Sequence, residues 1–367
     1  MINRSQDEII VDWPSDWTTP IVSIRCVTYN HEQYIADALD GFLIQKTSFP
    51  FEVIVHDDAS TDKTADIIRE YERKFPDIVK PIYETENQYS KHDGSLRNIM
   101  NKACKGKYYA LCEGDDYWTD PNKLQMQVDW LEEHDDYVMC CSNATIQSSN
   151  HSLSGARYWN DYDVPIIDMI CGRSCFLQTS TFIYRRNLLN FYPDYCIKCH
   201  VGDYPLQIWA SLNGKVRYFK KNTSTYRYCH PGSFTYSSYR IDIDSFVKGI
   251  KSEVTMLQGL DSFSNFRHHS TFKKVETAFV LQKAFFFTVS KQRKDLAKKI
   301  LSCFPEIFNS FSIYQKMDMF IYFHTPLFIY RAKRILDQIL KALTMPNTRN
   351  LFDFYQKIQE TLLSSNR

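Results

Sequence analysis

The stretch from Tyr108 to Gln127 reads YYALCEGDDYWTDPNKLQMQ and joins an apolar strand to a helix through an acidic turn. Glu113, Asp115 and Asp116 leave the strand close together, and carboxylates this near to one another repel. We therefore expect the turn to hold a divalent cation at the carboxyl end of a strand. A solvent-facing acidic turn, with Asp120 as an ordinary helix N-cap, is the alternative that this stretch alone leaves open.

Short apolar runs alternate with helical patterns around this stretch, which is typical of a βαβ sheet. The sequence predicts strands at 21–27, 51–55, 79–83, 108–112 and 216–219, and helices at 63–74, 96–104 and 202–213. Polar residues follow three of these strand ends, where ligands of open α/β sheets bind.

Composition excludes two classes of protein. The 367 residues include 44 basic and 43 acidic side chains, and a formal net charge of +1 argues against a general nucleic-acid binder. Only 11 residues are glycine, and neither GxGxxG nor GxxxxGK[ST] occurs, so no glycine-rich loop can hold a phosphate. We therefore expect a metal or side chains to neutralise any phosphate that binds.

The cysteines favour a reducing compartment. Eleven cysteines are scattered along the chain, and residues 1–17 lack the features of a signal peptide, so we predict a cytoplasmic protein. Cys196, Cys199 and His200 spell CxxCH, a spacing found in haem attachment and in zinc half-sites. No second ligand pair follows, and we interpret this spacing as chance.

The last third of the chain carries helical periodicity and no strand pattern. Its longest nearly apolar segment, Met319 to Tyr330, is too short to cross a bilayer. Residues 291–341 hold ten Lys or Arg against four Asp or Glu among many apolar side chains. This pattern favours either peripheral contact with the inner membrane face or a packed helix with solvated lysines.

Four motifs in order resemble those of the family 2 glycosyltransferases of the GT-A fold. They are PIVSIRCVTYN at 20–30, HDDASTD at 56–62, Arg97-Asn98 and EGDD at 113–116. The resemblance implies a Rossmann-like mixed α/β sheet flanked by helices over residues 20–240. An N-terminal extension (1–19) and a helical C-terminal region (241–367) lie outside it.

The resemblance implies where the donor nucleotide binds. Tyr29 matches the position whose side chain lies against the base, and an aromatic face suits that contact. Asp58 matches the carboxylate that hydrogen-bonds the pyrimidine edge, and Arg97 matches an arginine near the diphosphate. The residues alone leave Asp58 as a turn or cap residue and Arg97 as a solvated helix residue.

The acidic turn matches the D-x-D-D segment of the family, with Glu113 replacing the usual first aspartate. The resemblance implies that Asp116 binds the metal and that Asp115 reaches the ribose or the metal, while the share of Glu113 stays open. Mg²⁺ or Mn²⁺ prefers such oxygen ligands and stabilises a departing nucleoside diphosphate.

The stretch TYRYCHPGS at 225–233 resembles the family's Tyr-Arg-x-His-x-x-Ser ending of the catalytic domain. By this resemblance His230 is a candidate metal ligand, with a structural histidine as the alternative, and Arg227 is a candidate for neutralising phosphate. Trp118 is either a core residue or part of the sugar pocket.

Asp203 matches the aspartate that acts as general base in the family, and Gly202 replaces the glutamate that usually precedes it. A carboxylate beside the anomeric carbon accepts the proton of the attacking hydroxyl, so the resemblance implies inversion in one displacement. A helix cap is the alternative role for Asp203.

The resemblance thus implies a metal-dependent inverting glycosyltransferase of the hexosyltransferase type. We expect a nucleoside-diphosphate sugar as donor, with UDP as the expected carrier, and a saccharide or lipid-linked hydroxyl as acceptor in surface-polysaccharide synthesis. One rival, a sugar-phosphate nucleotidylyltransferase, needs a glycine-rich basic loop that residues 21–30 lack. A second rival is a non-catalytic sugar-binding relative, which the retention of Asp116 and Asp203 disfavours. The sequence identifies neither the sugar, the acceptor nor the oligomeric state.

Overall fold

A computed structural model describes most of the chain, namely residues 3–91, 93–148, 152–172, 177–233, 236, 242–283 and 294–324. The chain divides into two compact units. Unit 1 comprises Met1–Asp242 and Thr255–Arg267, and unit 2 comprises Ile243–Val254 and His268–Arg367. The candidate site residues all belong to unit 1.

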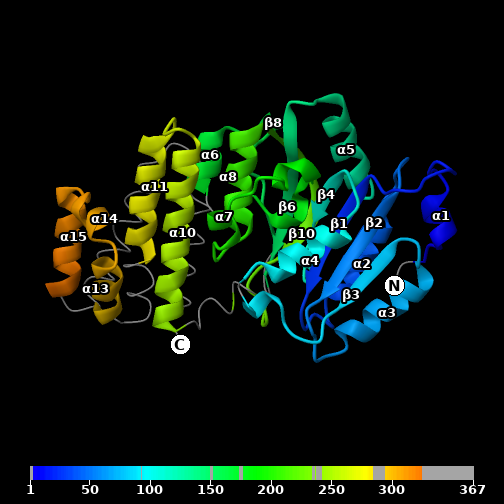
Figure 1. Ribbon diagram of the computed structural model, residues 1–367, viewed down its shortest axis with the longest axis horizontal. Helices are drawn as coiled ribbons and strands as arrows, with labels where there is room; N and C mark the ends of the chain where they lie inside the picture. The colour runs from blue at the N-terminus through cyan, green and yellow to red at the C-terminus, as the bar shows by residue number, and fades with distance from the viewer. Residues whose placement is uncertain are drawn as a thin grey trace. The chain divides into compact units, whose positions relative to one another are not determined.

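One mixed sheet organises unit 1 (Figure 1). Its strand order is β3-β2-β1-β4-β9-β6-β10-β5, with β7 beside β6 and β8 beside β10. The strands β3, β2, β1 and β4 are parallel, β9 runs against them, and β6 and β10 run parallel to each other and against β9. The carboxyl ends of β1, β2, β4 and β10 therefore point to the same edge of the sheet. The strands are β1 (Val22–Thr28), β2 (Phe51–Asp57), β3 (Val79–Tyr83), β4 (Tyr108–Leu111), β5 (Tyr117–Trp118), β6 (Tyr137–Gln147), β7 (Ser152–Ser154), β8 (Tyr162–Asp163), β9 (Ile183–Arg185) and β10 (Lys215–Arg227).

Helices pack on the sheet because their apolar residues recur at helical spacing. Side chains of α2, α3 and α5 join the apolar face of β1, β2 and β4 in one buried cluster, in which Val22, Ile24 and Cys26 of β1 are fully buried. The helices of unit 1 are α1 (Gln6–Ile10), α2 (Ile35–Leu43), α3 (Thr64–Lys74), α4 (Ser95–Ala103), α5 (Lys123–Glu133), α6 (Ile166–Gly172), α7 (Asp194–Ile197) and α8 (Asp203–Asn213), with short 3₁₀ turns η1 (Tyr89–Lys91), η2 (Thr179–Thr181) and η3 (Arg186–Leu189).

The helix after the acidic turn begins later than the proline suggests. Helix α5 begins at Lys123 with Asn122 as N-cap. Asp120 is therefore not the N-cap, because its Oδ1 accepts from the Asn122 amide at 3.1 Å and its Oδ2 pairs with Lys221 at 2.6 Å. The last predicted strand is also longer than expected: β10 runs to Arg227 through register shifts against β6. That extension brings its end to the acidic turn.

Unit 2 is helical in the part that the structure describes. Helix α10 (Ile243–Phe263) begins in unit 2 and ends in unit 1, and α11 (His269–Gln282), α13 (Lys294–Ser302), α14 (Pro305–Asn309) and α15 (Ile313–His324) follow. Apolar side chains of these helices, among them Val254, Val280 and Ile300, form a separate buried cluster. Within the described residues, no helix combines the length and the apolar character needed to cross a bilayer. Residues 291–293 and 325–341 of the segment for which the sequence left open membrane contact or a packed helix lie outside those residues.

Candidate active site at the carboxyl edge of the sheet

The acidic turn between β4 and β5 lies against the end of β10. The backbone amide of Arg227 donates to Asp116 Oδ1 at 2.9 Å, and its guanidinium Nη1 donates to the Asp115 carbonyl at 2.8 Å. The same guanidinium pairs with Asp37 of α2 through Nη2. Arg227 thus joins three elements that are far apart in the sequence.

Two aromatic rings hold the guanidinium of Arg227 in place. It lies 5.0 Å from the centre of the Tyr34 ring and 4.4 Å from that of Tyr117. A cation over an aromatic face is attracted to the ring, and the attraction grows when water is excluded. Only 14 % of the Arg227 side chain is exposed, so we describe Arg227, Asp37, Tyr34 and Tyr117 as the clamp on the acidic turn.

His230 contacts the first aspartate of the turn. Its Nε2 lies 3.0 Å from Asp115 Oδ2, and its ring packs 4.6 Å from that of Tyr34. Although burial raises it, the pKa of Asp115 lies below its usual value because of the hydrogen bond to His230 and the nearby histidine rings. Burial alone would lower the pKa of His230, but the contact with Asp115 raises it above its usual value.

The other two carboxylates of the turn lack such compensation. Asp116 is only 3 % exposed, and burial, followed by repulsion from Asp115 and Glu113, raises its pKa well above the usual value. Glu113 is exposed to solvent on one side, and the protein atoms around it together with the neighbouring Asp115 raise its pKa above the usual value. The solvent-facing turn, which the sequence left open as the alternative, is wrong for Asp116, because this carboxylate is buried against the end of β10.

These carboxylates fit a divalent cation by their chemistry. Raised pKa values at Glu113 and Asp116 indicate negative charge that the protein does not balance, and hard cations bind carboxylate oxygen. In the described part of the chain, no group of three or more His, Cys, Asp or Glu side chains converges as a complete metal cage. The residues present therefore supply part of a coordination shell, which Mg²⁺ sites commonly complete with water and phosphate oxygens.

The ends of β1 and β2 lie side by side next to the acidic turn. Thr28 pairs with Asp57 in the parallel register, and the Asp58 amide donates to the Thr28 carbonyl at 2.9 Å. The Asp58 carboxylate is 1 % exposed and accepts from the amides of Gln88 and Tyr89 at 2.7 and 2.9 Å. Asp58 thus orders the loop after β3.

Tyr29 presents an open aromatic face at this edge. It directly follows β1 and is 44 % exposed. The next residue, Asn30, has a positive φ of 55° and is held by Ser60 and Thr61 of the β2–α3 loop. These bonds fix the backbone that carries Tyr29, so the ring is presented from a rigid strand end.

Arg97 and Asp203 lie on helices. The Arg97 guanidinium of α4 lies 4.2 Å from the centre of the Tyr192 ring, and burial lowers its pKa. One of its terminal nitrogens is buried without an acceptor among the described residues. Asp203 is the first residue of α8 and is half-buried, while the N-cap is Gly202. Within the described residues, no contact joins the Arg97 side chain to the acidic turn.

His31 is a site residue that sequence reasoning missed. An added Cβ at Gly114 would lie 2.6 Å from Thr28 Oγ1 and 3.1 Å from His31 Nδ1, so His31 packs directly against the acidic turn. Burial lowers the pKa of His31, which keeps the ring neutral near pH 7. Its place directly after the Tyr29-Asn30 strand end was the available signal.

The other residues singled out in the sequence are structural. Trp118 is 2 % exposed and donates to the Ser180 carbonyl at 2.7 Å, so it is a core residue. Cys196 and Cys199 are free thiols.

Comparison with known proteins decides the family. Residues 23–192 match the family described as Glycosyl transferase family 2. These residues form a family 2 glycosyltransferase domain. The family assignment confirms the resemblance inferred from the four motifs and covers the ends of β1, β2 and β4.

The family 2 domain has relatives in several bacteria. An uncharacterized protein of Mycobacterium tuberculosis is 35% identical over 222 residues, which are 59% of this chain and 61% of the relative. The poly(ribitol-phosphate) beta-N-acetylglucosaminyltransferase TarS of Staphylococcus aureus is 29% identical over 170 residues, 46% of this chain and 28% of TarS. The chain thus spans less than two thirds of the length of these relatives.

Solved structures confirm the predicted fold class. The crystal structure of residues 1–349 of S. aureus TarS in complex with UDP-GlcNAc has a TM-score of 0.61 at 17% identity, covering 89% of this chain and 93% of that one. The mannosyltransferase PcManGT from Pyrobaculum calidifontis, in complex with GDP-Man and Mn²⁺, has a TM-score of 0.51 at 15% identity, covering 96% and 89%. The mixed sheet flanked by helices, with a helical C-terminal region, is the fold these proteins share.

Proposed function

We propose that the chain is a metal-dependent, inverting glycosyltransferase. It transfers a sugar from a nucleoside diphosphate, with UDP as the carrier, to a hydroxyl of a saccharide or lipid-linked acceptor in bacterial surface-polymer synthesis. Similarity to TarS, a poly(ribitol-phosphate) beta-N-acetylglucosaminyltransferase whose crystal structure contains UDP-GlcNAc, supports this choice of donor and of surface-polymer synthesis. The observation that carries the proposal is the acidic turn clamped at the carboxyl edge of the sheet, with Asp115 and Asp116 beside His230 and Arg227.

The donor nucleotide has a binding surface at the ends of β1 and β2. The exposed ring of Tyr29 offers a face for the base, and the buried carboxylate of Asp58 holds the neighbouring loop in place beside it. Arg97 has a buried guanidinium nitrogen for which the described residues provide no acceptor, which suits an anionic group of the donor. We assign these three side chains to donor binding.

The acidic turn receives the diphosphate. Asp116 and Glu113, with Asp115 and His230 beside them, would hold Mg²⁺ or Mn²⁺, and the Mn²⁺ bound with PcManGT supports this choice of metal. Such a cation supplies positive charge that stabilises the departing nucleoside diphosphate. The clamp keeps the carboxylates in place without motion during the reaction, which is the basis of electrostatic preorganisation.

Proton transfer is assigned to Asp203. As the first residue of α8, Asp203 carries its carboxylate at the positive end of the helix. It accepts the proton of the acceptor hydroxyl as that oxygen attacks the anomeric carbon from the face opposite the leaving group. The product therefore has the inverted anomeric configuration.

A panel of nucleotide sugars, offered with Mn²⁺ and analysed by mass spectrometry, tests the proposal. We expect release of nucleoside diphosphate from one UDP-sugar, and loss of that release in excess EDTA. Asp203→Asn keeps the size of the side chain but removes proton acceptance, so turnover should fall at least about 10²-fold while donor affinity stays within a few-fold. Equal losses in affinity and turnover would make Asp203 structural, and retention of configuration would exclude the single displacement.

A further inference from the structure

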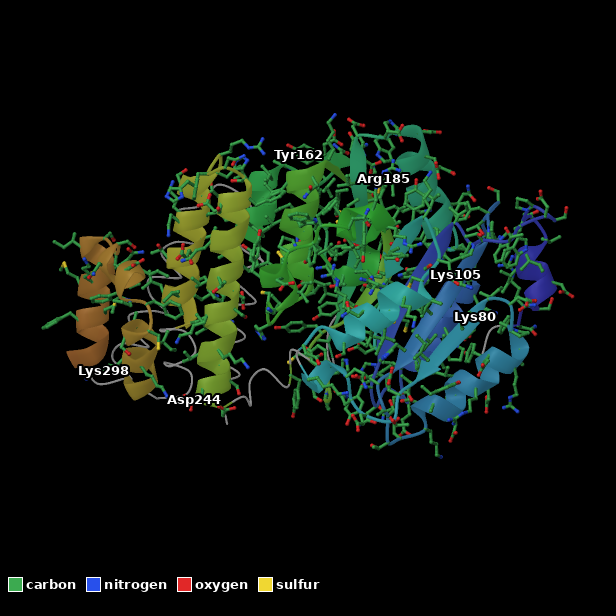
Figure 2. All side chains as sticks on the ribbon, viewed as in Figure 1. Lys80, Lys105, Tyr162, Arg185, Asp244 and Lys298 are labelled. Carbon is green, nitrogen blue, oxygen red and sulfur yellow. The ribbon has the colours of Figure 1, made fainter. Side chains whose placement is uncertain are left out.

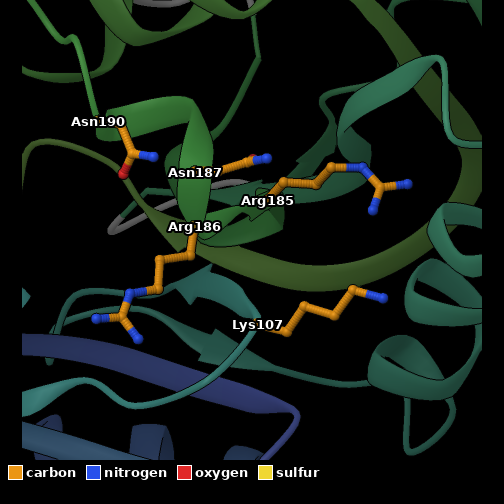
Figure 3. A pocket seen from close by; sticks show the side chains of 5 residues that line it. All are labelled: Lys107, Arg185, Arg186, Asn187 and Asn190. Carbon is orange, nitrogen blue, oxygen red and sulfur yellow. The ribbon is translucent and has the colours of Figure 1, made fainter.

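A second polar pocket lies at the sheet edge opposite the acidic turn. It has a volume of about 330 Å³ and is lined by Lys107, Arg185, Arg186, Asn187 and Asn190 (Figure 3). Lys107 directly precedes β4, whereas Glu113 follows that strand. Six residues of extended chain separate the two positions by on the order of 20 Å, so the pocket is separate from the proposed donor site.

Two guanidinium groups line this pocket, and their hydrogen-bond partners are neutral. Arg185 donates to the Tyr137 carbonyl at 2.7 Å, the His134 carbonyl at 3.2 Å and the Tyr108 hydroxyl at 3.2 Å. Its one carboxylate neighbour, Asp135, is 3.6 Å away and fully exposed, so water largely screens that charge. Arg185 is therefore a fixed cation with little compensation, held by the carbonyls at the end of α5.

Arg186 and the two asparagines have donors to spare. Arg186 Nη1 donates to the Lys105 carbonyl at 3.3 Å, which is the one side-chain hydrogen bond recorded for it among the described residues. The side-chain amides of Asn187 and Asn190 make no hydrogen bond within the described part of the chain. Lys107 pairs with Glu132 at 2.6 Å, but both side chains are about half exposed, and such a surface pair contributes little.

We propose that this pocket binds the phosphate group of a phosphate ester. Arg186, Asn187 and Asn190 keep more free donors among the described residues than the two oxygens of a carboxylate can accept, whereas a phosphate has up to four acceptor oxygens and a charge near −2. Arg185 and Lys107 have most of their donors in bonds to protein groups and add positive charge. The pocket lies at the lower end of the volumes of small-molecule sites, which suits a phosphate with part of its ester. The proposal does not depend on the transferase activity.

The pocket is tested by titrating the full chain with sodium phosphate against sodium chloride at equal ionic strength, by calorimetry and thermal denaturation. The titration contains no nucleotide, because UDP is itself a phosphate ester and would compete with phosphate for the pocket. We expect phosphate to bind and to raise the melting temperature. Arg186→Glu should weaken binding at least about tenfold, since a charge-assisted hydrogen bond is replaced by repulsion.

Lys80 gives the matched control. It is an exposed cation on β3 that also donates to a carbonyl, that of Pro76 at 2.6 Å, and it lies apart from Arg185 (Figure 2). Lys80→Glu should leave phosphate binding unchanged, and Asn190→Ala gives a milder second variant in the pocket. Equal phosphate affinity in the wild type, Arg186→Glu and Asn190→Ala, or no difference between phosphate and chloride, would overturn the proposal.

Two further arms identify the source of the phosphate. Sedimentation with vesicles that contain phosphatidic acid, a lipid phosphate monoester, supports the pocket if it is lost in Arg186→Glu, and makes a lipid headgroup the ligand. Binding of glycerol 3-phosphate without vesicle binding supports the pocket and makes a soluble ester the ligand. UDP binding is measured in a separate titration with Mn²⁺. Failure of UDP to bind there would count against the proposed transferase, while the comparison of Arg186→Glu with Lys80→Glu still decides the pocket.

Discussion

Replacing Arg227 with methionine should loosen the acidic turn at a cost of about 3 kcal/mol in the free energy of unfolding. The hydrogen bond to the Asp115 carbonyl, at 2.8 Å from a guanidinium that is 14 % exposed, accounts for about 2 kcal/mol. The pair with Asp37 adds less than about 1 kcal/mol because Asp37 is 57 % exposed. The rings of Tyr34 and Tyr117 add roughly 0.5 kcal/mol each beyond the apolar contact that methionine keeps.

Urea denaturation of the purified chain measures this change, and Arg69→Met is the matched control. Arg69 also pairs with an aspartate, Asp66 at 2.8 Å, and lies 4.8 Å from the centre of the Tyr83 ring, but its side chain is 52 % exposed. We expect a loss below about 1 kcal/mol for Arg69→Met. A double-mutant cycle of Arg227→Met with Asp37→Asn should give a coupling below about 1 kcal/mol. Equal losses at Arg227 and Arg69 would refute the clamp, because burial would then make no difference.

Three further changes test the site and its surroundings. Asp116→Asn keeps an acceptor for the Arg227 amide and removes a buried carboxylate whose pKa is raised, so transfer should fall at least about 10²-fold while stability without divalent cations rises. Asp115→Asn removes a carboxylate whose pKa is lowered and should reduce stability. A lower stability of both variants in urea would contradict this difference. Gly114→Ala places a Cβ 2.7 Å from Thr28 Cβ and should lower the free energy of unfolding by about 1–3 kcal/mol, as measured by thermal denaturation. An unchanged melting temperature would contradict this. Burial lowers the pKa of Lys123 to about 7, below its unfolded value, so the unfolded chain binds more protons than the folded chain from about pH 7 to 10.5. The free energy of unfolding of the wild type should therefore rise relative to that of Lys123→Met across that range, by up to about 1.4 kcal/mol per pH unit. Parallel curves of unfolding free energy against pH for the two proteins would contradict this.

Local sequence pattern predicted the first βαβ units closely. Strand β3 has the predicted bounds Val79–Tyr83, and α3 begins one residue after the predicted start. Buried parallel strands are apolar along their whole length, and helices repeat their apolar residues at 3.6, so both are visible within a short window. The course of β10 was not visible in this way, because its bends depend on pairing with β6 rather than on its own residues.

The carboxylates of the site were predictable from sequence, and their electrostatic state was not. The EGDD motif located the acidic turn, but the burial of Asp116 depends on Arg227, which is 111 residues away in sequence. The pairing of Arg227 with Asp37 spans 190 residues. No local pattern predicts which basic side chain contacts which acidic side chain across such a separation. The motif therefore supports a cation site, but it does not indicate which carboxylate has its negative charge balanced by protein groups.

The end of β10 divides the three carboxylates into two electrostatic classes. Asp115 is matched within the protein, because His230 contacts it and the net effect lowers its pKa. Asp116 receives a backbone amide and some attraction from the Arg227 guanidinium, which do not offset its burial and the repulsion from Asp115 and Glu113, so its pKa is raised. The pKa of Glu113 is raised by surrounding protein atoms and by Asp115. The negative charge that protein groups do not balance is therefore that of Asp116 and Glu113. A cation bound there would balance that charge while Asp115 and His230 hold the turn, which assigns binding to one pair of residues and positioning to the other.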